Sequence, residues 1–179
     1  QALREFDTNL FGWHHLIRQV LPPMLEAKEG RIVQNSSVLG LVAMKYRGAY
    51  NASKFALEGY TDTLRLELEG SGVHISLIEP GPIDTRFRAN ARAAFVRHID
   101  PAQSRHQGAY RQTLTRLEKE GSTSGFTLPS EACIPPLLHA LQSKRPKHRY
   151  PVTLPTRLFS ILRRLLPSRW LDRILGKSV

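Results

Sequence analysis

The sequence predicts an α/β fold with a doubly wound parallel sheet. Apolar residues recur at three- and four-residue steps over 3–25 and 49–70, which is the spacing of amphipathic helices. Two short runs of mostly apolar residues, 31–36 and 73–79, each follow one of these segments and have the length of buried strands. Helix, strand, helix and strand with short connections are typical of parallel strands joined by crossover helices.

The first helix is expected over 3–25. Pro22 and Pro23 stand near its C-terminal end, and we expect them to distort the last turn because proline has no N–H to donate. The apolar face of this helix consists of Leu3, Phe6, Leu10, Trp13, Ile17, Val20, Leu21 and Met24.

A loop is expected between the first strand, 31–36, and the second helix, 49–70. This helix has an apolar stripe and also a face of small residues that suits close packing of another backbone. The stripe contains Leu57, Leu64 and Leu68, and the small residues are Ala49, Ala52, Ser53, Ala56 and Gly59.

The second strand, 73–79, ends at Pro80-Gly81-Pro82, which neither a helix nor a central strand could cross. A helix at about 129–143 and a short strand at about 149–153 are expected later in the chain. Together these elements predict a partial catalytic domain over 1–153.

A polar segment, 85–127, interrupts the alternation of helices and strands. Two helices are expected within it, at about 88–98 and 101–120, and neither has a strong apolar stripe. We therefore expect a mobile excursion over the sheet edge that forms the substrate loop.

Residues 154–179 are predicted to form a basic amphipathic helical tail. From Leu141 to the end, ten basic residues stand against Asp172 alone, so +9 of the net charge of +11 lies in the last 39 residues. Over 155–176 we expect one helix or a pair broken at Pro167. The apolar face contains Leu158, Ile161, Leu162, Leu165, Leu166, Trp170, Leu171, Ile174 and Leu175.

The tail has two open interpretations. It packs on its own domain, covering the substrate entrance or a second subunit, or it makes peripheral contact with a membrane through 155–176. Basic residues beside an apolar face that contains Trp170 suit the headgroup region of a bilayer. Nucleic-acid binding is not expected, because the chain has neither a docking motif nor aromatic residues interleaved with the basic ones.

Composition limits the class of protein. A hydrophobic fraction of 41% is ordinary for a globular domain, and no run approaches the roughly 20 apolar residues of a membrane span. The single cysteine, Cys133, excludes an internal disulfide and a cysteine-based zinc site, and no metal is expected. A reducing, cytoplasmic compartment fits this cysteine usage.

Tyr50 and Lys54 carry the candidate chemistry because they lie four residues apart on one face of a helix. A phenol with a pKa of about 10 is a poor acid or base at neutral pH. A lysine ammonium some 5 Å away favours the phenolate by roughly 3 kcal/mol at an effective dielectric of about 20. The pair therefore predicts a tyrosine whose pKa is lowered for proton transfer. The alternative is a solvated pair on a helix surface.

Ser37 follows the strand 31–36 and precedes Tyr50 by 13 residues. Ligands of parallel sheets bind at the carboxyl ends of the strands, so we expect its hydroxyl to polarise a carbonyl oxygen beside Tyr50. Two alternatives stay open. Ser37 is a turn serine that bonds its own backbone, or Ser36 takes its place, although we expect Ser36 to face the neighbouring strands.

Three strings resemble one family, the short-chain dehydrogenases/reductases. IVQNSSVLGLVAMKYRGAYNASKFALEGYTDTLRLEL resembles its catalytic centre, FDTNLFG its central helix and ISLIEPGPIDT the turn that receives the nicotinamide. The resemblance is detailed to about residue 95. Later residues, including KHRYPVTLPTRLF, are similar to the branch that handles steroids, retinoids and other bulky alcohols. This implies the C-terminal two-thirds of a Rossmann-type fold.

The resemblance implies a role for each catalytic residue. Tyr50 exchanges a proton with the substrate oxygen, and Ser37 hydrogen-bonds the same oxygen. Lys54 lowers the pKa of Tyr50 and holds the nicotinamide ribose. Asn9 fixes a water molecule that connects Lys54 to solvent.

The resemblance also implies NAD or NADP as the cofactor. Besides Tyr50 and Lys54, four residues after the second strand are expected to line the nicotinamide, and the last of them is expected to bond its carboxamide. They are Pro80, Gly81, Ile83 and Thr85.

The glycine-rich turn with which this family holds the dinucleotide phosphates is absent from the sequence, as are the strands around it. The chain also begins without Met, inside a predicted helix, so we expect it to be a piece of a longer protein. This chain alone is expected to bind cofactor weakly or not at all. The choice between NAD and NADP stays open, because the residues that decide it belong to the absent part.

The expected function is the NAD(P)-dependent interconversion of a hydrophobic primary or secondary alcohol and its aldehyde or ketone. A homo-oligomer through the helices 3–25 and 49–70 is expected from the resemblance. The alternative is a non-catalytic fragment, or one that binds a membrane surface through its basic tail.

Overall fold

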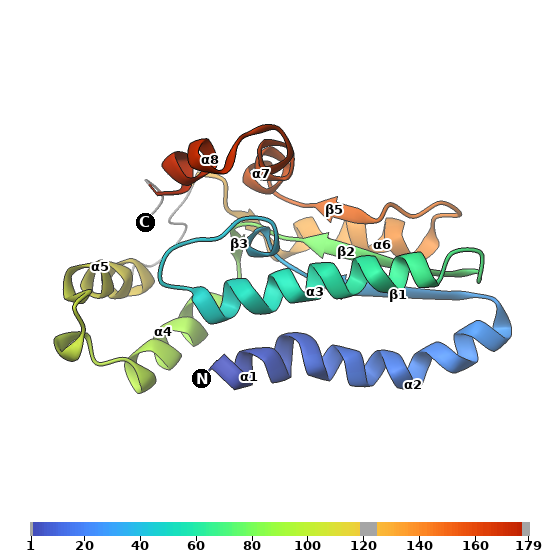
Figure 1. Cartoon of the computed structure of the whole chain (residues 1–179), viewed down its shortest axis with the longest axis horizontal. Coiled ribbons are helices and arrows are strands. Elements are labelled where there is room, and N and C mark those ends of the chain that lie inside the picture. The colour runs from blue at the N-terminus through green and yellow to red at the C-terminus, as the bar shows by residue number, and fades with distance from the viewer. Residues whose placement is uncertain (1, 119–124, 177–179) are drawn as a thin grey trace.

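The structure, a computed structural model, describes residues 2–118 and 125–176. These residues form an α/β fold around a parallel sheet, as the sequence predicts (Figure 1). Residue 1, the stretch 119–124 and the stretch 177–179 lie outside the described residues. They include parts of the predicted domain, of the 85–127 excursion with its second helix, and of the tail.

The central sheet has three parallel strands in the order β1-β2-β5. Gly30 of β1 lies opposite Val73 of β2, and Leu77 of β2 lies opposite Arg149 of β5. The predicted strand 73–79 is confirmed residue for residue, whereas the other two differ by one or two residues at their ends. The strands are β1 Gly30–Asn35, β2 Val73–Glu79 and β5 Arg149–Pro151.

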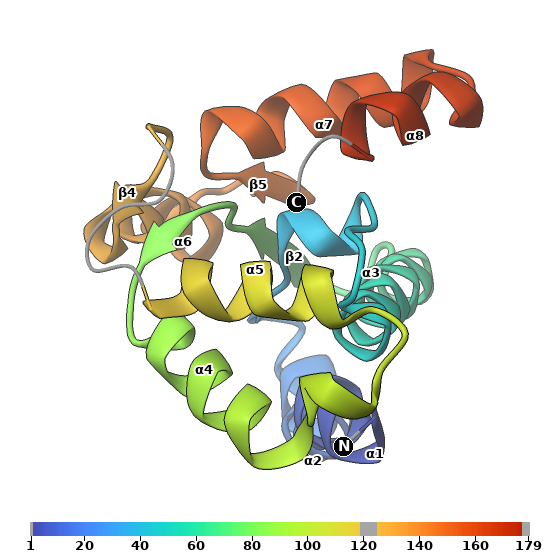
Figure 2. The same cartoon turned by 90° about the vertical axis from the view of Figure 1, so that its left-hand side faces the viewer.

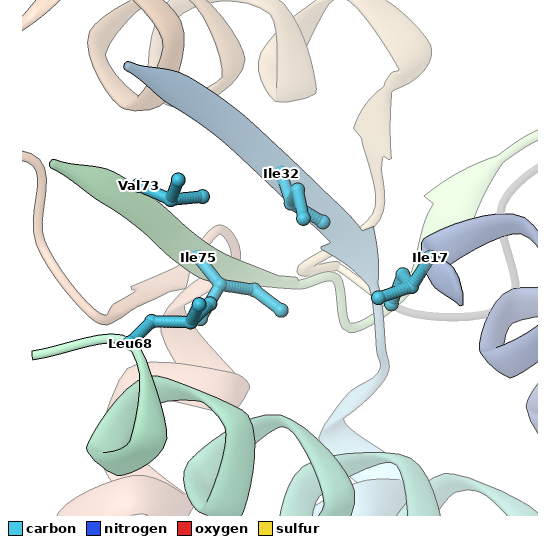
Figure 3. Packing of buried hydrophobic residues seen from close by; sticks show 5 residues of the cluster. All are labelled: Ile17, Ile32, Leu68, Val73 and Ile75. Carbon is cyan, nitrogen blue, oxygen red and sulfur yellow. The ribbon is translucent and has the colours of Figure 1, made fainter. Parts of the chain in front are cut away.

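Helices cover both faces of this sheet, which makes it doubly wound. On one face, α2 (Gly12–Ala27) and α3 (Gly48–Glu67) enclose a cluster of buried aliphatic side chains (Figure 3). On the other face, α6 (Ile134–Gln142) packs against β1 and β2. The first cluster contains Ile17, Ile32, Leu68, Val73 and Ile75, and the second contains Ile78, Ala140, Tyr150 and Val152.

The first long helix differs from the prediction in two ways. It consists of α1 (Ala2–Phe6), a π-helical segment (Asp7–Phe11) and α2, so its register shifts where no shift was expected. It also continues through Pro22 and Pro23 to Ala27, where left-handed Lys28 (φ 53°) ends it. Each proline leaves the carbonyl one turn earlier without its N–H donor. The helix tolerates this because those carbonyls belong to exposed residues and can be hydrogen-bonded by water.

The segment after β2 forms two helices that pack on each other, α4 (Phe87–His98) and α5 (Gln107–Glu118), joined by a 3₁₀ turn at Pro101–Gln103. Phe95 is buried between them, with its ring 5.7 Å from that of Tyr110. Two short parallel strands, which the sequence analysis did not predict, pair at the base of the segment. They are β3 Ile83–Asp84 and β4 Leu128–Pro129.

The end of the chain forms a helix pair broken at Pro167, as expected. α7 (Leu154–Leu165) packs against β5 and the 3₁₀ turn Val38–Gly40, and α8 (Ser168–Leu175) follows. A second view places α7 and α8 on the side of the molecule away from α1 and α2 (Figure 2). Before α6 the chain makes a 3₁₀ turn at Ser130–Cys133. The division into a domain over 1–153 and a tail over 154–179 stays a prediction.

None of the described helices is long and apolar enough to cross a membrane.

Candidate active site

The candidate site lies where β1 and β2 end side by side. The backbone N–H of Val38, just past β1, donates to the carbonyl of Pro80, just past β2, at 2.8 Å. Helix α3 begins at Gly48 and brings Tyr50, in its first turn, to this edge. The Ser37 side chain lies close enough to the Tyr50 hydroxyl there for hydrogen bonding to it to lower the pKa of Tyr50. The structure therefore joins the two residues that the spacing predicted to meet.

Lys54 lies one turn beyond Tyr50 on α3 and is only 6% exposed. Its ammonium Nζ donates to the carbonyl of Asn35 at 2.8 Å and lies 5.8 Å from the centre of the Tyr50 ring. Burial lowers the pKa of Lys54 from 10.5 to about 8, although the carboxylates of Glu5 and Glu58 oppose this. Lys54 is thus a cation that can give up its proton close to neutral pH.

The expectation that Lys54 lowers the pKa of Tyr50 is wrong for this structure. Burial of the phenol raises the pKa of Tyr50 above 10.0, and Glu5 raises it further. The hydrogen bond from Ser37 and the charge of Arg47 lower the pKa of Tyr50, but by less. Desolvation decides the direction because it disfavours the phenolate.

Asn9 reaches the same helix from the π-helical segment. Its amide Nδ2 donates to Ser53 Oγ at 3.0 Å and to Glu5 Oε2 at 3.2 Å. Ser53 in turn donates to the backbone carbonyl of Tyr50 at 2.9 Å. Asn9 therefore contacts the helix that carries Tyr50 and Lys54 through Ser53.

The two serines at the end of β1 have different surroundings. Ser36 is buried and its hydroxyl donates to the carboxylate of Glu58 on α3. Ser36 was expected to face the neighbouring strands, but it faces this helix instead. Ser37 Oγ accepts from the backbone N–H of Leu39 at 3.1 Å, as the turn-serine interpretation expects, and the same side chain lowers the pKa of Tyr50.

The turn after β2 holds the other predicted residues. A Cβ on Gly81 would lie 2.1 Å from Thr153 Oγ1, so the close approach of the backbone to α7 requires glycine there. Ile83 packs against the Ile78 cluster. Thr85 is exposed, and its Oγ1 accepts from the backbone N–H that opens α4 at 3.2 Å.

Sequence reasoning missed three neighbours of Tyr50. The ring of Phe87 lies 5.8 Å from the Tyr50 ring, and Glu5 and Arg47 affect the pKa of the phenol. The spacing of Glu5, four residues before Asn9, is a signal that could have found it. Phe87 follows a turn whose path the sequence does not define.

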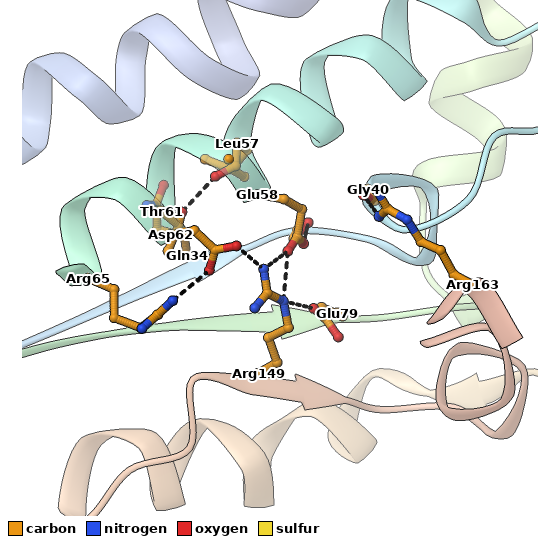
Figure 4. Close-up of polar contacts among 12 residues, drawn as sticks. Gln34, Gly40, Leu57, Glu58, Thr61, Asp62, Arg65, Glu79, Arg149 and Arg163 are labelled. Atoms are coloured by element: carbon orange, nitrogen blue, oxygen red, sulfur yellow. Dashed lines mark hydrogen bonds and ion pairs between the residues drawn. The ribbon is translucent and has the colours of Figure 1, made fainter. Parts of the chain in front are cut away.

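It also missed a partly buried ionic cluster behind the site (Figure 4). Arg149 of β5 lies 3.2 Å from Glu58 Oε2 and 2.7 Å from Asp62 Oδ2, both on α3. Its Nε lies 3.1 Å from Oε1 of the fully buried Glu79, an ion-pair distance without hydrogen-bond geometry. Arg149 thus connects β5, α3 and β2.

Among residues 2–118 and 125–176, no group of three or more His, Cys, Asp or Glu side chains could hold a metal ion. Cys133 is a partly buried free thiol, and burial raises its pKa.

Residues 1–95, which contain the tyrosine, the lysine, both serines and the turn after β2, match the model of a family described as short chain dehydrogenase. The chain belongs to the short-chain dehydrogenase/reductase family. It is 45% identical over 175 residues to the oxidoreductase YbbO of Escherichia coli (strain K12), a match that covers 98% of this chain and 59% of that protein. The chain thus spans less than two thirds of the length of this relative.

Two further comparisons support the same family. The chain is 46% identical over 88 residues to retinol dehydrogenase 8 of Homo sapiens, covering 49% of this chain and 28% of that protein. A crystal structure of a short-chain dehydrogenase/reductase from Burkholderia phymatum in complex with NAD is 29% identical. It superposes with a TM-score of 0.66, covering 96% of this chain and 58% of that one.

Proposed function

We propose that this chain carries the proton-transfer site of an NAD(P)-dependent oxidoreductase. The protein interconverts a hydrophobic primary or secondary alcohol and its aldehyde or ketone. The proximity of the Ser37 and Tyr50 side chains at the ends of two parallel strands, with Lys54 one turn away, carries this proposal. Family membership supports it, and the intact constellation of side chains does not favour the alternative of a non-catalytic fragment.

The phenol of Tyr50 donates its proton to the substrate oxygen in reduction and accepts it back in oxidation. Ser37 donates a hydrogen bond to the same oxygen and stabilises the charge that develops there. Lys54, whose pKa is about 8, replaces the proton of Tyr50 from solvent. Asn9 belongs to this proton path, since its amide contacts Ser53 on the same helix.

The residues at this edge fit the nicotinamide half of NAD or NADP. An ammonium has three hydrogens, and Lys54 gives one of them to Asn35, which leaves donors for the ribose hydroxyls. Tyr50, Pro80, Gly81, Ile83 and Thr85 complete the proposed nicotinamide site. The cofactor supplies or accepts the hydride when it is bound. The phosphates need a glycine-rich turn that this chain lacks, so we expect weak cofactor binding by the chain alone.

A hydrophobic substrate is supported by two observations. Phe87 is 57% exposed and its ring contacts that of Tyr50, so an aromatic surface adjoins the proton donor. The name of human retinol dehydrogenase 8, to which half of the chain is similar, specifies an apolar alcohol. The substrate class therefore stands on the surroundings of Tyr50 and on this relative.

Replacement of Tyr50 tests the function in the protein that contains this chain. We expect Tyr50→Phe to lower kcat by about 10²- to 10⁴-fold, which is the range of general acid–base catalysis. The matched control is Tyr46→Phe, which changes an exposed tyrosine in the turn before α3. Nicotinamide absorbance with long-chain and aromatic alcohols or ketones measures both. An equal kcat for Tyr50→Phe and wild type would contradict the proposal.

We further propose a homo-oligomer and a cytoplasmic location with peripheral membrane contact by 155–176. Helices α2 and α3 lie together, with His14 Nδ1 3.0 Å from Tyr60 Oη. They leave Leu16 and Leu66 49% and 63% exposed, which supports an interface between subunits there.

A further inference from the structure

The apolar stripe of α7 faces away from the protein. Its side chains recur at three- and four-residue steps and therefore share one face of the helix. Each is more than half exposed, although such a stripe normally packs on a core. The stripe consists of Leu154 (62% exposed), Leu158 (51%), Ile161 (55%) and Leu165 (72%).

The opposite side of the helix pair fixes this orientation. Thr156 of α7 and Leu175 of α8 are buried. Arg163 donates to the carbonyl of Gly40 at 3.4 Å and stacks 4.9 Å from the centre of the Phe55 ring. The stripe therefore cannot turn inward without breaking these contacts.

Positive charge lies beside the stripe. Arg157 and Arg164 are exposed on one flank of α7. On α8, Trp170 is 59% exposed, and the guanidinium of Arg173 lies 5.5 Å from the centre of its ring. Asp172 is the single acidic residue between 154 and 176. An apolar stripe with arginines and a tryptophan beside it matches the boundary between the acyl chains and the anionic headgroups of a bilayer.

Another exposed apolar row of comparable length, on α6, lacks this charge. Helix α6 also shows an outward apolar row, but its sequence, IPPLLHALQ, contains neither Lys nor Arg. The row consists of Ile134 (49% exposed), Leu137 (37%), Leu138 (45%) and Leu141 (43%). Charge rather than apolar exposure thus distinguishes the face of α7 and α8.

We propose that this face, defined by the α7 stripe with Trp170 and the arginines beside it, docks on an anionic lipid bilayer. It lies on the side away from α1 and α2, so docking leaves the proposed subunit interface free (Figure 2). At its end, Lys45 donates to the carbonyl of Gly176 at 3.0 Å, and Lys45 belongs to the segment between Ser37 and Tyr50. The docked face therefore adjoins the candidate site. Docking does not depend on the proposed reaction.

Flotation with lipid vesicles tests the proposal. We expect the protein to float with vesicles of phosphatidylcholine and phosphatidylglycerol, but not with phosphatidylcholine alone. Leu158→Gln/Ile161→Gln should weaken this binding about tenfold or more, because two apolar anchors are lost. Arg169→Gln/Arg173→Gln, which changes two exposed arginines of α8, should weaken it about tenfold and reduce its sensitivity to salt. The matched control, Leu137→Gln/Leu138→Gln on α6, should bind like wild type.

A fluorescence measurement keeps the test independent of the folding of these variants. The chain has two tryptophans, so Trp13→Phe leaves Trp170 alone. We expect brominated phosphatidylglycerol to quench Trp170. Absence of flotation, absence of quenching, or equal losses in the α6 and α7 variants would overturn the proposal. So would an oligomer that only Leu158→Gln/Ile161→Gln dissociates, because a second copy of the chain would then cover the stripe.

Discussion

At the scale of single residues, Glu79 places a carboxyl group inside the sheet. Its side chain is fully buried, and neither oxygen has a hydrogen-bond partner among the described residues. Burial and the nearby Glu58 raise the pKa of Glu79 from 4.5 to about 8, against the opposing charges of Arg149 and Arg164. Glu79 is therefore largely protonated at neutral pH in the folded protein.

This pKa predicts a pH dependence of stability. Between about pH 4.5 and 8, the folded state keeps a proton on Glu79 that the unfolded state releases, so the free energy of unfolding falls as pH rises. Glu79→Gln should remove this fall, leaving stability similar at pH 5 and raising it above pH 8. Urea unfolding across this range measures the effect.

Glu69→Gln, a change at an exposed position, is the control and should follow wild type. A variant Glu79→Gln that loses stability at pH 8 and above would show instead that an ionised Glu79 pairs favourably with Arg149.

The positions of the candidate site could be predicted from the sequence, but its protonation could not. Helical periodicity alone puts Tyr50 and Lys54 on one face, and the strand before Ser37 brings that hydroxyl to the same edge. The pKa of Tyr50 depends on its burial and on Glu5 and Arg47. These influences on the pKa arise from packing between separate segments, which cannot be deduced from the spacing of residues in the sequence.

At the scale of secondary-structure elements, Arg149 holds the short strand β5 to its neighbours. We expect Arg149→Ala to lower the free energy of unfolding by about 3–5 kcal/mol, because the buried carboxylate of Glu58 loses its cation. The control is Arg65→Ala, which removes a more exposed pair with Asp62 at 3.5 Å and should cost about 0–1 kcal/mol. Denaturant unfolding compares the two. Equal losses would mean that the cluster contributes no more than a surface pair.

The turn after β2 gives a second prediction at this scale. Gly81→Ala should destabilise the protein by about 1–3 kcal/mol, because the new methyl group displaces Thr153 and Thr156. These two threonines are buried, and their hydroxyls are hydrogen-bonded to each other at 3.0 Å. Gly59→Ala, within α3 and with no atom near the added Cβ, should stabilise it by about 0.5–1 kcal/mol. Thermal unfolding of both variants checks the opposite signs. A stabilised Gly81→Ala protein would contradict the close approach.

Elements could be predicted where local signals mark both ends. Glycine before 73 and proline after 79 bound β2, and its prediction is correct. The π-helical segment at Asp7–Phe11 keeps an apolar spacing that an ordinary helix also shows. β3 and β4 have two residues each, too few for a period, and they pair across more than 40 residues of chain. Their formation depends on the path of α4 and α5.

At the scale of the whole molecule, the proposed subunit interface predicts a change in mass. Leu16→Lys/Leu66→Lys should shift the protein from dimer or larger oligomer to monomer, because it places charge in an apolar contact. Val96→Lys on α4, also at an exposed apolar position, should leave the mass unchanged. Light scattering after size exclusion measures all three proteins. A monomeric wild type, or an oligomer that both variants preserve, would place subunit contacts elsewhere.

The brevity of β5 has a mechanical consequence. Only three residues, Arg149–Pro151, pair this strand with the sheet, and α7 starts three residues later. The last two helices are therefore joined to the sheet by a strand that pairs over only three residues, whereas β1 and β2 pair over six. We therefore expect the amides of β5, α7 and α8 to exchange with solvent before those of the two longer strands.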